Sequence, residues 1–503
     1  MIISDVLGTI VCHQDGTPNT EKFYFVVGGL DLQEHKPVHI GQYVSISTEE
    51  GLIIAHVEQV QKTNRYFAQI DAVHDFTRTG KSFSGIFPVD RWEYLLAEAK
   101  PLGVFQKGRV QRLTYPPSPG AQVRIPDERI LSDFLGFSDQ GIHLGDLLFH
   151  DIPARFNLTR MFQKHVALLA MSGAGKSYTA AVMIEELLLR KPEEGRPAIL
   201  ILDVHGEYIG LEESHAATEA NFEDKITIIR SPLVELATPQ LNSVDFARYS
   251  PEMSGIQIRE LTRIIRTLRK ARKGKTYDLD DLIAAVENDP SGNVRTREAL
   301  LGWLDNLQRL QLFGKTSTPD WSKIMIPGKA VILEMSDTIS LRKKQIIAAE
   351  VVQQLFYLRR ENQIPPTIVI VEEAHQFCPE ARRGLALSKS IFETVAREGR
   401  KYNLGLALIS QRPVRLSTTV LSQCGTNIFL RITNPYDLDH LKSSSEQITK
   451  STLTSISSLS VGEALVVGQG TRFPVFIKIR PRITKETSFG DDFETVAKRF
   501  EKE

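Results

Sequence analysis

The chain has 503 residues, of which 42% are hydrophobic and 24% are charged, a composition typical of globular proteins. A single core does not grow to this size, so the length predicts roughly two to four domains. The 61 basic and 61 acidic residues give a formal net charge of zero. A nucleic-acid partner would therefore need a local basic surface, such as the inside of a ring.

No apolar run approaches the roughly 18 residues that a transmembrane helix needs, so we expect no membrane contact. The N-terminus lacks a basic segment followed by an apolar one, which predicts a cytoplasmic protein without a signal peptide. The three cysteines, Cys12, Cys378 and Cys424, are odd in number and far apart. They argue against a disulfide framework and against a cysteine-built zinc site.

Residues 1–150 predict a small β-barrel followed by a linker. Gly28-Gly29, Gly41 and Asn64-Arg65 are the expected turns or bulges between short β-rich runs. A proline-rich stretch, Pro116–Gly120, then interrupts the chain, and an extended stretch is expected from there to about Asn157. The expected strands of the barrel are Phe23–Val27, Tyr43–Ser47, Leu52–Gln59 and Tyr66–Ala72.

A phosphate-binding loop is predicted at Ala170–Ser177, between an apolar strand (His165–Leu169) and a helix (Tyr178–Arg190). Backbone N–H groups of its glycine-rich turn and the positive end of the helix would surround the β-phosphate of a nucleoside triphosphate. Lys176 would reach the β- and γ-phosphates, and the hydroxyl of Ser177 would ligate Mg²⁺. The residues expected to hold the nucleotide are Ser172, Gly173, Ala174, Gly175, Lys176, Ser177 and Tyr178.

The alternative for this stretch is a chance glycine-lysine turn, and the order of strand, loop and helix argues against it. The strict pattern has glycine at the first position, where this chain has Ala170. That departure matters only if the residue needs a positive φ.

Residues 151–484 predict an α/β core, because strands and helices alternate as in a mostly parallel sheet that is covered on both faces. A helical period replaces this alternation at about 245–320, which predicts a helical insertion, and residues 485–503 form a C-terminal tail. One face of the insertion carries Ile258, Leu261, Ile264, Ile265 and Leu268. The expected strands that follow the phosphate loop are Ile199–Asp203, Ile226–Ile229, Ala330–Glu334, Thr367–Val371, Leu404–Ser410 and Asn427–Arg431.

A second nucleotide motif is predicted where the apolar strand Thr367–Val371 ends in Glu372 and Glu373. Ligands of open α/β sheets bind at the carboxyl ends of the strands. Glu372 would hold Mg²⁺ directly or through water, while Glu373 would orient and deprotonate the attacking water. The alternative is a strand end with two solvated acids, but the presence of the phosphate loop favours the nucleotide motif.

Three polar residues further along the chain are candidates for sensing and stabilising the γ-phosphate. Gln411 follows the strand Leu404–Ser410, where an amide can act as a sensor. Arg397 and Arg400 are candidate arginine fingers, because a guanidinium makes bidentate contacts to the charge that develops in phosphoryl transfer. A surface salt bridge is the alternative for each arginine.

Weaker patterns leave their alternatives open. Asp203, His205 and Glu207 alternate along a strand end, which a metal site could use, although hydrogen bonds near the nucleotide or a subunit boundary are favoured. His375 and Cys378 are too few ligands for a zinc site. A basic run could touch DNA phosphates or form a solvated helix face, and it comprises Arg263, Arg266, Arg269, Lys270, Arg272, Lys273 and Lys275.

Taken together, six of these stretches resemble the HerA DNA translocases of the FtsK–HerA superfamily. The stretches are Ala170–Ser177, Leu202–Tyr208, Glu372–His375, Arg397–Arg400, Ser410–Pro413 and Leu421–Cys424. The N-terminal β-rich region is similar to the barrel that precedes the motor core in this family, and Gly462–Pro481 is similar to its closing strands. Two departures are Ala170 and Glu372, the latter standing where many relatives have aspartate.

The resemblance implies a RecA-like P-loop ATPase core in a homo-hexameric ring that binds ATP and Mg²⁺ and pumps double-stranded DNA through its pore. It also implies a partner, the nuclease NurA, and a role in resecting DNA ends during double-strand break repair. ATP would lie between subunits, with an arginine supplied by the neighbour. The alternatives are a related motor of an antiphage defence or conjugation system, and a nucleotide-gated scaffold that hardly translocates.

Overall fold

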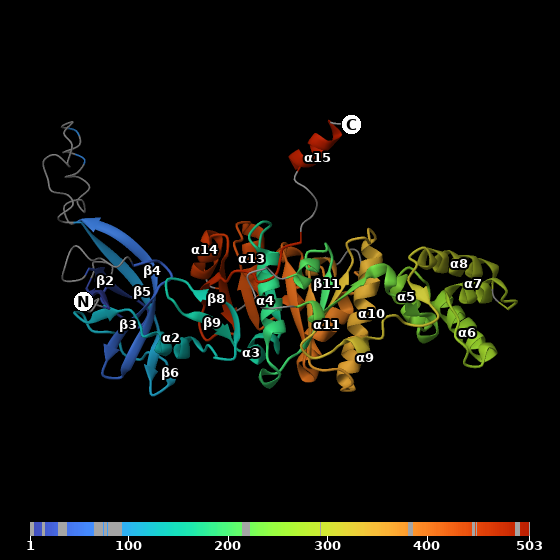
Figure 1. Cartoon of the computed structure of the whole chain (residues 1–503), viewed down its shortest axis with the longest axis horizontal. Coiled ribbons are helices and arrows are strands. Elements are labelled where there is room, and N and C mark those ends of the chain that lie inside the picture. The colour runs from blue at the N-terminus through green and yellow to red at the C-terminus, as the bar shows by residue number, and fades with distance from the viewer. Residues whose placement is uncertain are drawn as a thin grey trace. The chain divides into compact units, whose positions relative to one another are not determined.

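The computed structural model describes residues 5–12, 16–28, 38–64, 74, 78, 93–213, 222–291, 293–380, 386–444, 448, 450–487 and 493–501. The chain forms two compact units (Figure 1). The first comprises residues 1–156 with 471–478, and the second comprises residues 157–470 with 479–503.

The first unit contains a small closed barrel, as predicted. Within the described residues, six strands follow one another in the order β2-β1-β7-β3-β4-β5, and a pairing between β2 and β5 closes the ring. Apolar side chains fill the barrel, among them Phe25, Ile46, Ile53 and Val123. The strands are β1 (Val6–Val11), β2 (Phe23–Val27), β3 (Tyr43–Thr48), β4 (Gly51–Asn64), β5 (Glu93–Gln106) and β7 (Gln122–Arg124), with the short β6 (Arg109–Gln111) paired to β5.

One detail of this unit differs from the sequence prediction, and another is not tested. Asn64 is the last residue of β4 rather than part of a turn, because β4 pairs with β5 along its whole length. The predicted strand Tyr66–Ala72 and the residue Arg65 lie outside the described residues.

The prediction of an extended stretch up to Asn157 is wrong, because α2 (Glu128–Leu135) lies within it. The carboxylate of Asp127 caps this helix by accepting from the N–H groups of Arg129 and Ile130, each at 3.0 Å. Gly136 ends the helix with a φ of 85°, which glycine adopts without strain. A hairpin of β8 (Ile142–Leu147) and β9 (Pro153–Phe156) follows.

A late segment, residues 471–478, completes the first unit. The Tyr43 hydroxyl donates to the carbonyl of Pro474 at 2.7 Å, and the rings of Phe134 and Phe473 stack with centroids 4.7 Å apart. This segment contains most of β20 (Val475–Ile479). The first unit is therefore built from two distant parts of the sequence.

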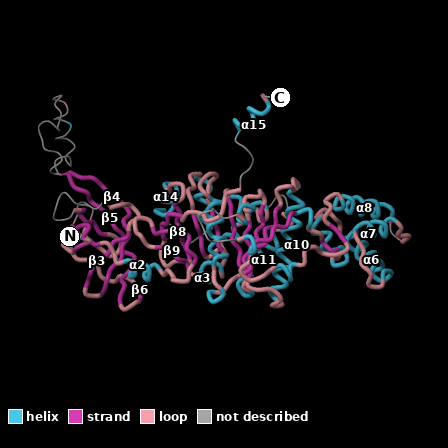
Figure 2. The backbone as a smooth tube through the Cα atoms, in the orientation of Figure 1, coloured by secondary structure: helices cyan, strands magenta, loops and turns pink. Residues whose placement is uncertain are grey.

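The second unit is built on a mostly parallel sheet, as predicted. Figure 2 shows its strands with helices beside them. Its strands follow the order β12-β15-β11-β16-β17-β10-β18-β19, and only β18 and β19 pair antiparallel among the described pairs of this unit. Every residue of β10, β11, β15, β16 and β17 is buried, so both faces of the sheet are covered. The strands are β10 (Val166–Leu169), β11 (Ala198–Asp203), β12 (Ile226–Arg230), β15 (Ala330–Glu334), β16 (Thr367–Val371), β17 (Leu404–Ser410), β18 (Thr426–Phe429) and β19 (Glu463–Gly468).

Helices connect these strands. The phosphate loop leads into α4 (Lys176–Leu189), and α10 (Leu341–Arg360) and α11 (Lys389–Glu398) lie on either side of β16 in the sequence. The shorter helices of the unit are α3 (Leu158–Phe162), α9 (Trp321–Ile324), α12 (Thr418–Leu421), α13 (Pro435–Ser444), α14 (Lys450–Ser458) and α15 (Phe493–Phe500).

The predicted helical insertion is present. Its long helix α6 buries Leu261, Ile264 and Ile265, three members of the predicted apolar face. A short parallel pair, β13 (Leu236–Ala237) with β14 (Phe313–Gly314), joins the two ends of the insertion. Its helices are α5 (Ser243–Tyr249), α6 (Gly255–Arg272), α7 (Leu279–Glu287) and α8 (Val294–Gln308). Across the described part of the chain, no helix has the length and apolar character that a membrane span requires.

Candidate nucleotide site

The phosphate loop has the backbone that its sequence predicts. Gly173 and Gly175 have φ values of 76° and 92°, and Gly175 directly precedes the first residue of α4. A Cβ added to either glycine would meet nothing within 4 Å, so open space lies beside the loop where a phosphate could approach. Ala170 is buried and does not have a positive φ, so the alanine at this position causes no strain.

The sheet order brings the predicted motifs to one edge. β17 pairs with β10 on one side and with β16 on the other. Leu169, the last residue of β10, is opposite Ser410, and Gln411 directly follows. Because all these strands are parallel, the phosphate loop, the two glutamates and the candidate sensor Gln411 follow the carboxyl ends of three adjacent strands.

Lys176 forms an ion pair with Glu373, and both side chains are largely buried. His375 Nδ1 lies 3.2 Å from the other carboxylate oxygen of Glu373 and 3.1 Å from the hydroxyl of Ser410. Burial alone would raise the pKa of Glu373, but the close contact with His375 and the charge of Lys176 outweigh it and lower the pKa to about 2. Glu373 is therefore a carboxylate at neutral pH.

Glu373 also has an unusual backbone. Its φ of 47° places a residue that is not glycine in the left-handed region, at a cost of roughly 1–3 kcal/mol. Such strain is found preferentially at functional sites. Here the turn directs the carboxylate toward Lys176.

Glu372 is fully buried beside Glu373. One carboxyl oxygen accepts from the N–H groups of Val204 (2.9 Å) and His205 (3.2 Å). The other oxygen is buried without a hydrogen-bond partner among the described residues. Burial and the nearby carboxylates of Asp203 and Glu207 raise the pKa of Glu372 to about 10.

Asp203, at the end of β11, shapes the turn that follows. Its carboxylate accepts from the N–H groups of Gly206 (2.7 Å), Glu207 (3.0 Å) and Tyr208 (3.0 Å). This turn presents Glu207 to the phosphate loop, where the hydroxyl of Ser177 donates to its carboxylate. Hydrogen bonding is thus the role of Asp203 and Glu207, while His205 is exposed.

The residues present fit Mg²⁺ bound together with a nucleotide. Mg²⁺ takes few protein ligands and completes its shell with waters and phosphate oxygens. Ser177 offers a hydroxyl, and Glu372 offers a buried oxygen that has no other partner in the described chain. The described residues contain no group of three or more His, Cys, Asp or Glu side chains placed to hold a metal by themselves.

The two candidate arginine fingers are exposed. Arg397 lies in the last turn of α11, and Arg400 lies in the short 3-10 helix that follows it. Neither guanidinium makes an ion pair or hydrogen bond within the described part of the chain. Both are therefore available to a neighbouring molecule.

The basic run of the insertion is partly structural. Arg263 pairs with Glu260 and Asp289, and Arg272 pairs with Asp281. Arg269 donates to two backbone carbonyls at 2.8 and 2.9 Å. These contacts favour a bundle-stabilising role for three of the seven basic residues, while the other four, Arg266, Lys270, Lys273 and Lys275, are exposed.

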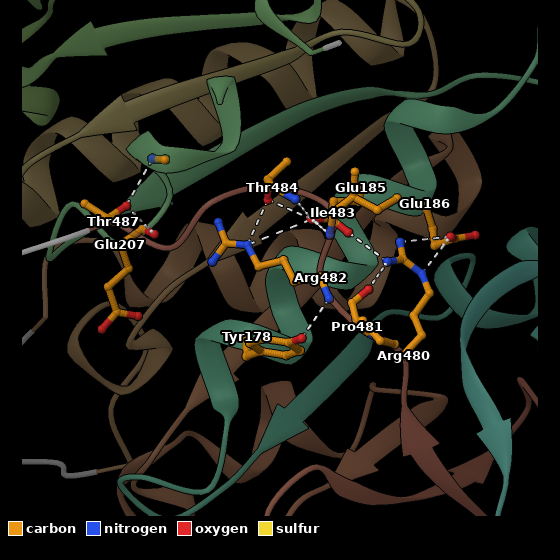
Figure 3. Close-up of polar contacts among 11 residues, drawn as sticks. Tyr178, Glu185, Glu186, Glu207, Arg480, Pro481, Arg482, Ile483, Thr484 and Thr487 are labelled. Atoms are coloured by element: carbon orange, nitrogen blue, oxygen red, sulfur yellow. Dashed lines mark hydrogen bonds and ion pairs between the residues drawn. The ribbon is translucent and has the colours of Figure 1, made fainter. Parts of the chain in front are cut away.

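A C-terminal segment that was not predicted as part of the site lies against α4. Tyr178, expected beside the nucleotide, uses its hydroxyl to accept from the N–H of Arg482 at 2.7 Å (Figure 3). Arg480 forms ion pairs with Glu185 and Glu186. Two consecutive glutamates in a helix that is otherwise mostly apolar are the signal that could have predicted a basic partner.

The sheet order, the phosphate loop and the paired glutamates define a RecA-like P-loop ATPase. VirB4 of Thermoanaerobacter pseudethanolicus has a similar fold, with a TM-score of 0.53 and 17% identity over 69% of this chain and 98% of that chain. This likeness concerns the fold alone.

Sequence comparisons show a similarity to HerA helicases. Residues 142–355 match the family model of the HerA helicase central domain. A probable helicase of Methanocaldococcus jannaschii is 26% identical over 95% of this chain and 96% of that protein. The DNA double-strand break repair helicase HerA of Sulfurisphaera tokodaii is 27% identical over 90% and 92%, and that of Pyrococcus furiosus is 24% identical over 88% of each. The chain is therefore similar to HerA helicases over most of its length.

Proposed function

We propose that the protein is a hexameric, ATP-dependent translocase of double-stranded DNA that acts with a nuclease of the NurA type in DNA end resection. The observation that carries this proposal is the pairing of Lys176 with Glu373 beside an open phosphate loop. Relatives that are named DNA double-strand break repair helicases align with most of the chain, which supports the same role here.

In this proposal the loop residues bind the phosphates and Glu373 activates water. The N–H groups that follow Gly173 and Gly175 would receive the β-phosphate, and Lys176 would move from Glu373 to the phosphates. Glu373 is then free to accept a proton from the attacking water, while His375 keeps its carboxylate oriented. Ser177 and Glu372 would hold Mg²⁺, which would neutralise phosphate charge when bound.

Replacing Glu373 separates binding from chemistry. We expect Glu373→Gln to retain ATP affinity and to reduce turnover by about a hundredfold or more, because the amide cannot accept the proton from water. Steady-state ATPase kinetics and binding of a fluorescent ATP analogue measure the two effects. If ATP binding fell in parallel with turnover, Glu373 would be a structural residue instead.

The barrel is the proposed docking site for the nuclease, because it carries no nucleotide motif of its own. Deleting residues 1–150 would be a poor test, since residues 471–478 pack against them. A surface substitution in the full chain avoids this difficulty. Ile40 is 57% exposed in the first unit, and Tyr436 is 78% exposed in the second.

We expect Ile40→Asp to weaken nuclease capture by about tenfold or more, because a charge in the apolar part of an interface loses its hydration. Tyr436→Asp should leave capture unchanged. A pull-down with a purified NurA-type nuclease measures both, with ATPase activity as the check on folding. Equal capture by both variants would place the docking surface elsewhere.

The experiment that tests the proposed function is hydrolysis of ATP with and without duplex DNA, together with displacement of a third strand from a DNA triplex. A translocase should show stimulated hydrolysis and displacement. A nucleotide-gated scaffold should show little of either. A motor of a defence or conjugation system would translocate but would not stimulate a NurA-type nuclease, and electron microscopy with ATP decides whether the ring is hexameric.

A further inference from the structure

The C-terminal segment Arg480–Thr487, called here the C-terminal strap, joins two elements of the nucleotide site. Figure 3 shows the strap beside α4, with Thr487 close to Glu207. None of the nucleotide motifs includes it.

The first anchor of the strap is Glu185, a fully buried residue of α4. One carboxylate oxygen accepts from the N–H groups of Ile483 (3.0 Å) and Thr484 (2.8 Å) and from the hydroxyl of Thr484 (2.7 Å). The other oxygen is 2.9 Å from Arg480. A buried carboxylate is tolerated only with such partners, so α4 and the strap fix one another.

The second anchor is the turn after β11. The hydroxyl of Thr487 donates to the carbonyl of Glu207 and accepts from the N–H of Gly210, both at 3.0 Å. The hydroxyl thus acts as donor and acceptor at once. A Cβ on Gly210 would lie 2.7 Å from the carbonyl oxygen of Lys485 and 3.0 Å from the Thr487 nitrogen, so the two backbones are in close contact.

These two anchors lie on the elements that carry Ser177 and Glu207. Ser177 is in the first turn of α4, and Glu207 is in the turn that Thr487 holds. The contact between the Ser177 hydroxyl and the Glu207 carboxylate depends on the separation of these elements. A carboxylate that binds a metal-ligating hydroxyl directs the lone pairs of that hydroxyl toward the metal.

We propose that Thr487 is a positioning residue of the metal–nucleotide site, which holds the main chain of Glu207 so that its carboxylate orients Ser177. The inference rests on the proposed binding of nucleotide and Mg²⁺. It adds a residue near the C-terminus to a site that the phosphate loop and the two glutamates otherwise define. Thr487 acts through Glu207 and does not itself reach the reacting atoms.

The test is the Mg²⁺ dependence of nucleotide binding by the full chain. Valine keeps the shape of threonine but cannot form either hydrogen bond. We expect Thr487→Val to raise the Mg²⁺ concentration for half-maximal binding of a fluorescent ADP analogue about five- to tenfold. Turnover at saturating Mg²⁺ should stay within about twofold of the wild type, and Thr487→Ser should restore the original Mg²⁺ dependence.

Two further variants distinguish a positioning role of Thr487 from a general destabilisation of the strap. Lys485→Gln removes an exposed ion pair with Glu213 (2.9 Å) in the same strap and should leave the Mg²⁺ dependence unchanged. Gly210→Ala pushes the strap away from the turn and should raise the Mg²⁺ requirement as Thr487→Val does. Thermal melting of each variant reports on folding, and Gly210→Ala decides the matter if Thr487→Val does not fold.

An unchanged Mg²⁺ dependence in Thr487→Val and Gly210→Ala would overturn the inference, as would an equal shift in Lys485→Gln. Nucleotide binding by the wild type that does not depend on Mg²⁺ would overturn it too. Failure of the proposed function has a different signature. In that case the wild type binds nucleotide with Mg²⁺ but hydrolyses no ATP, while the shift in Thr487→Val still supports the role of the strap.

Discussion

Lys176→Ala is expected to show no detectable ATP hydrolysis. Lys176 follows the glycines of the phosphate loop and supplies a full positive charge that alanine cannot replace. Its ion pair with Glu373 is lost as well, but the contact of that carboxylate with His375 remains, so we expect the fold to be retained. A coupled ATPase assay, thermal melting and size-exclusion chromatography with light scattering measure activity, folding and assembly.

The matched control for this prediction is Lys275→Ala, which removes an exposed lysine of the basic run in the helical insertion. Hydrolysis without DNA should be unaffected by this change. Turnover near that of the wild type in Lys176→Ala would show that the nucleotide binds elsewhere. A loss of folding would instead assign the Lys176–Glu373 pair a structural role.

The sequence predicted most of the sheet because its strands are fully buried and therefore uniformly apolar. Thr367–Val371 and Leu404–Ser410 were expected at their observed bounds, and Asn427–Arg431 is shifted by one or two residues. The predicted strand Asn427–Arg431 ends later than β18 because the apolar run continues past Phe429, the last residue of β18. Such runs mark a buried strand more clearly than they mark its termini.

The sequence predicted the motif residues but not the contacts among them. Lys176 and Glu373 were each recognised from local patterns, whereas the ion pair between them depends on β17 lying between β10 and β16. Glu207 belonged to a weak alternating pattern and to the HerA-like stretch Leu202–Tyr208, and neither assigned it a partner. Its contact with Ser177 depends on the turn that Asp203 shapes, a tertiary feature.

The helix α2 was not predicted, although local sequence patterns indicate it. Asp127 and Gly136 are ordinary cap residues, and Leu131, Phe134 and Leu135 are spaced as one buried face. The information was local, but the nearby prolines suggested an irregular stretch. The contacts of the C-terminal strap could not be predicted from local patterns, because Glu185 and Arg480 are 295 positions apart in the sequence.

Arg400→Ala is expected to suppress hydrolysis about a thousandfold with little change in nucleotide binding. An arginine finger supplied by a neighbouring subunit contributes roughly this factor, whereas an exposed salt bridge contributes under about 1 kcal/mol. Arg400 is exposed after α11 and has no partner among the described side chains, as a residue that acts on a neighbour requires. Arg397→Ala, three residues earlier, is the matched control and should have a smaller effect.

Mixed rings test whether Arg400 acts across the subunit boundary. Subunits with Lys176→Ala retain Arg400, and subunits with Arg400→Ala retain Lys176, so an interface between them contains one complete site. Mixing the two inactive variants should therefore restore part of the activity once subunits exchange. No recovery at any ratio, in rings shown to exchange, would argue against a finger in trans unless hydrolysis needs every site in the ring to be intact. Near-normal turnover by Arg400→Ala alone would transfer the role to Arg397 or remove it from both arginines.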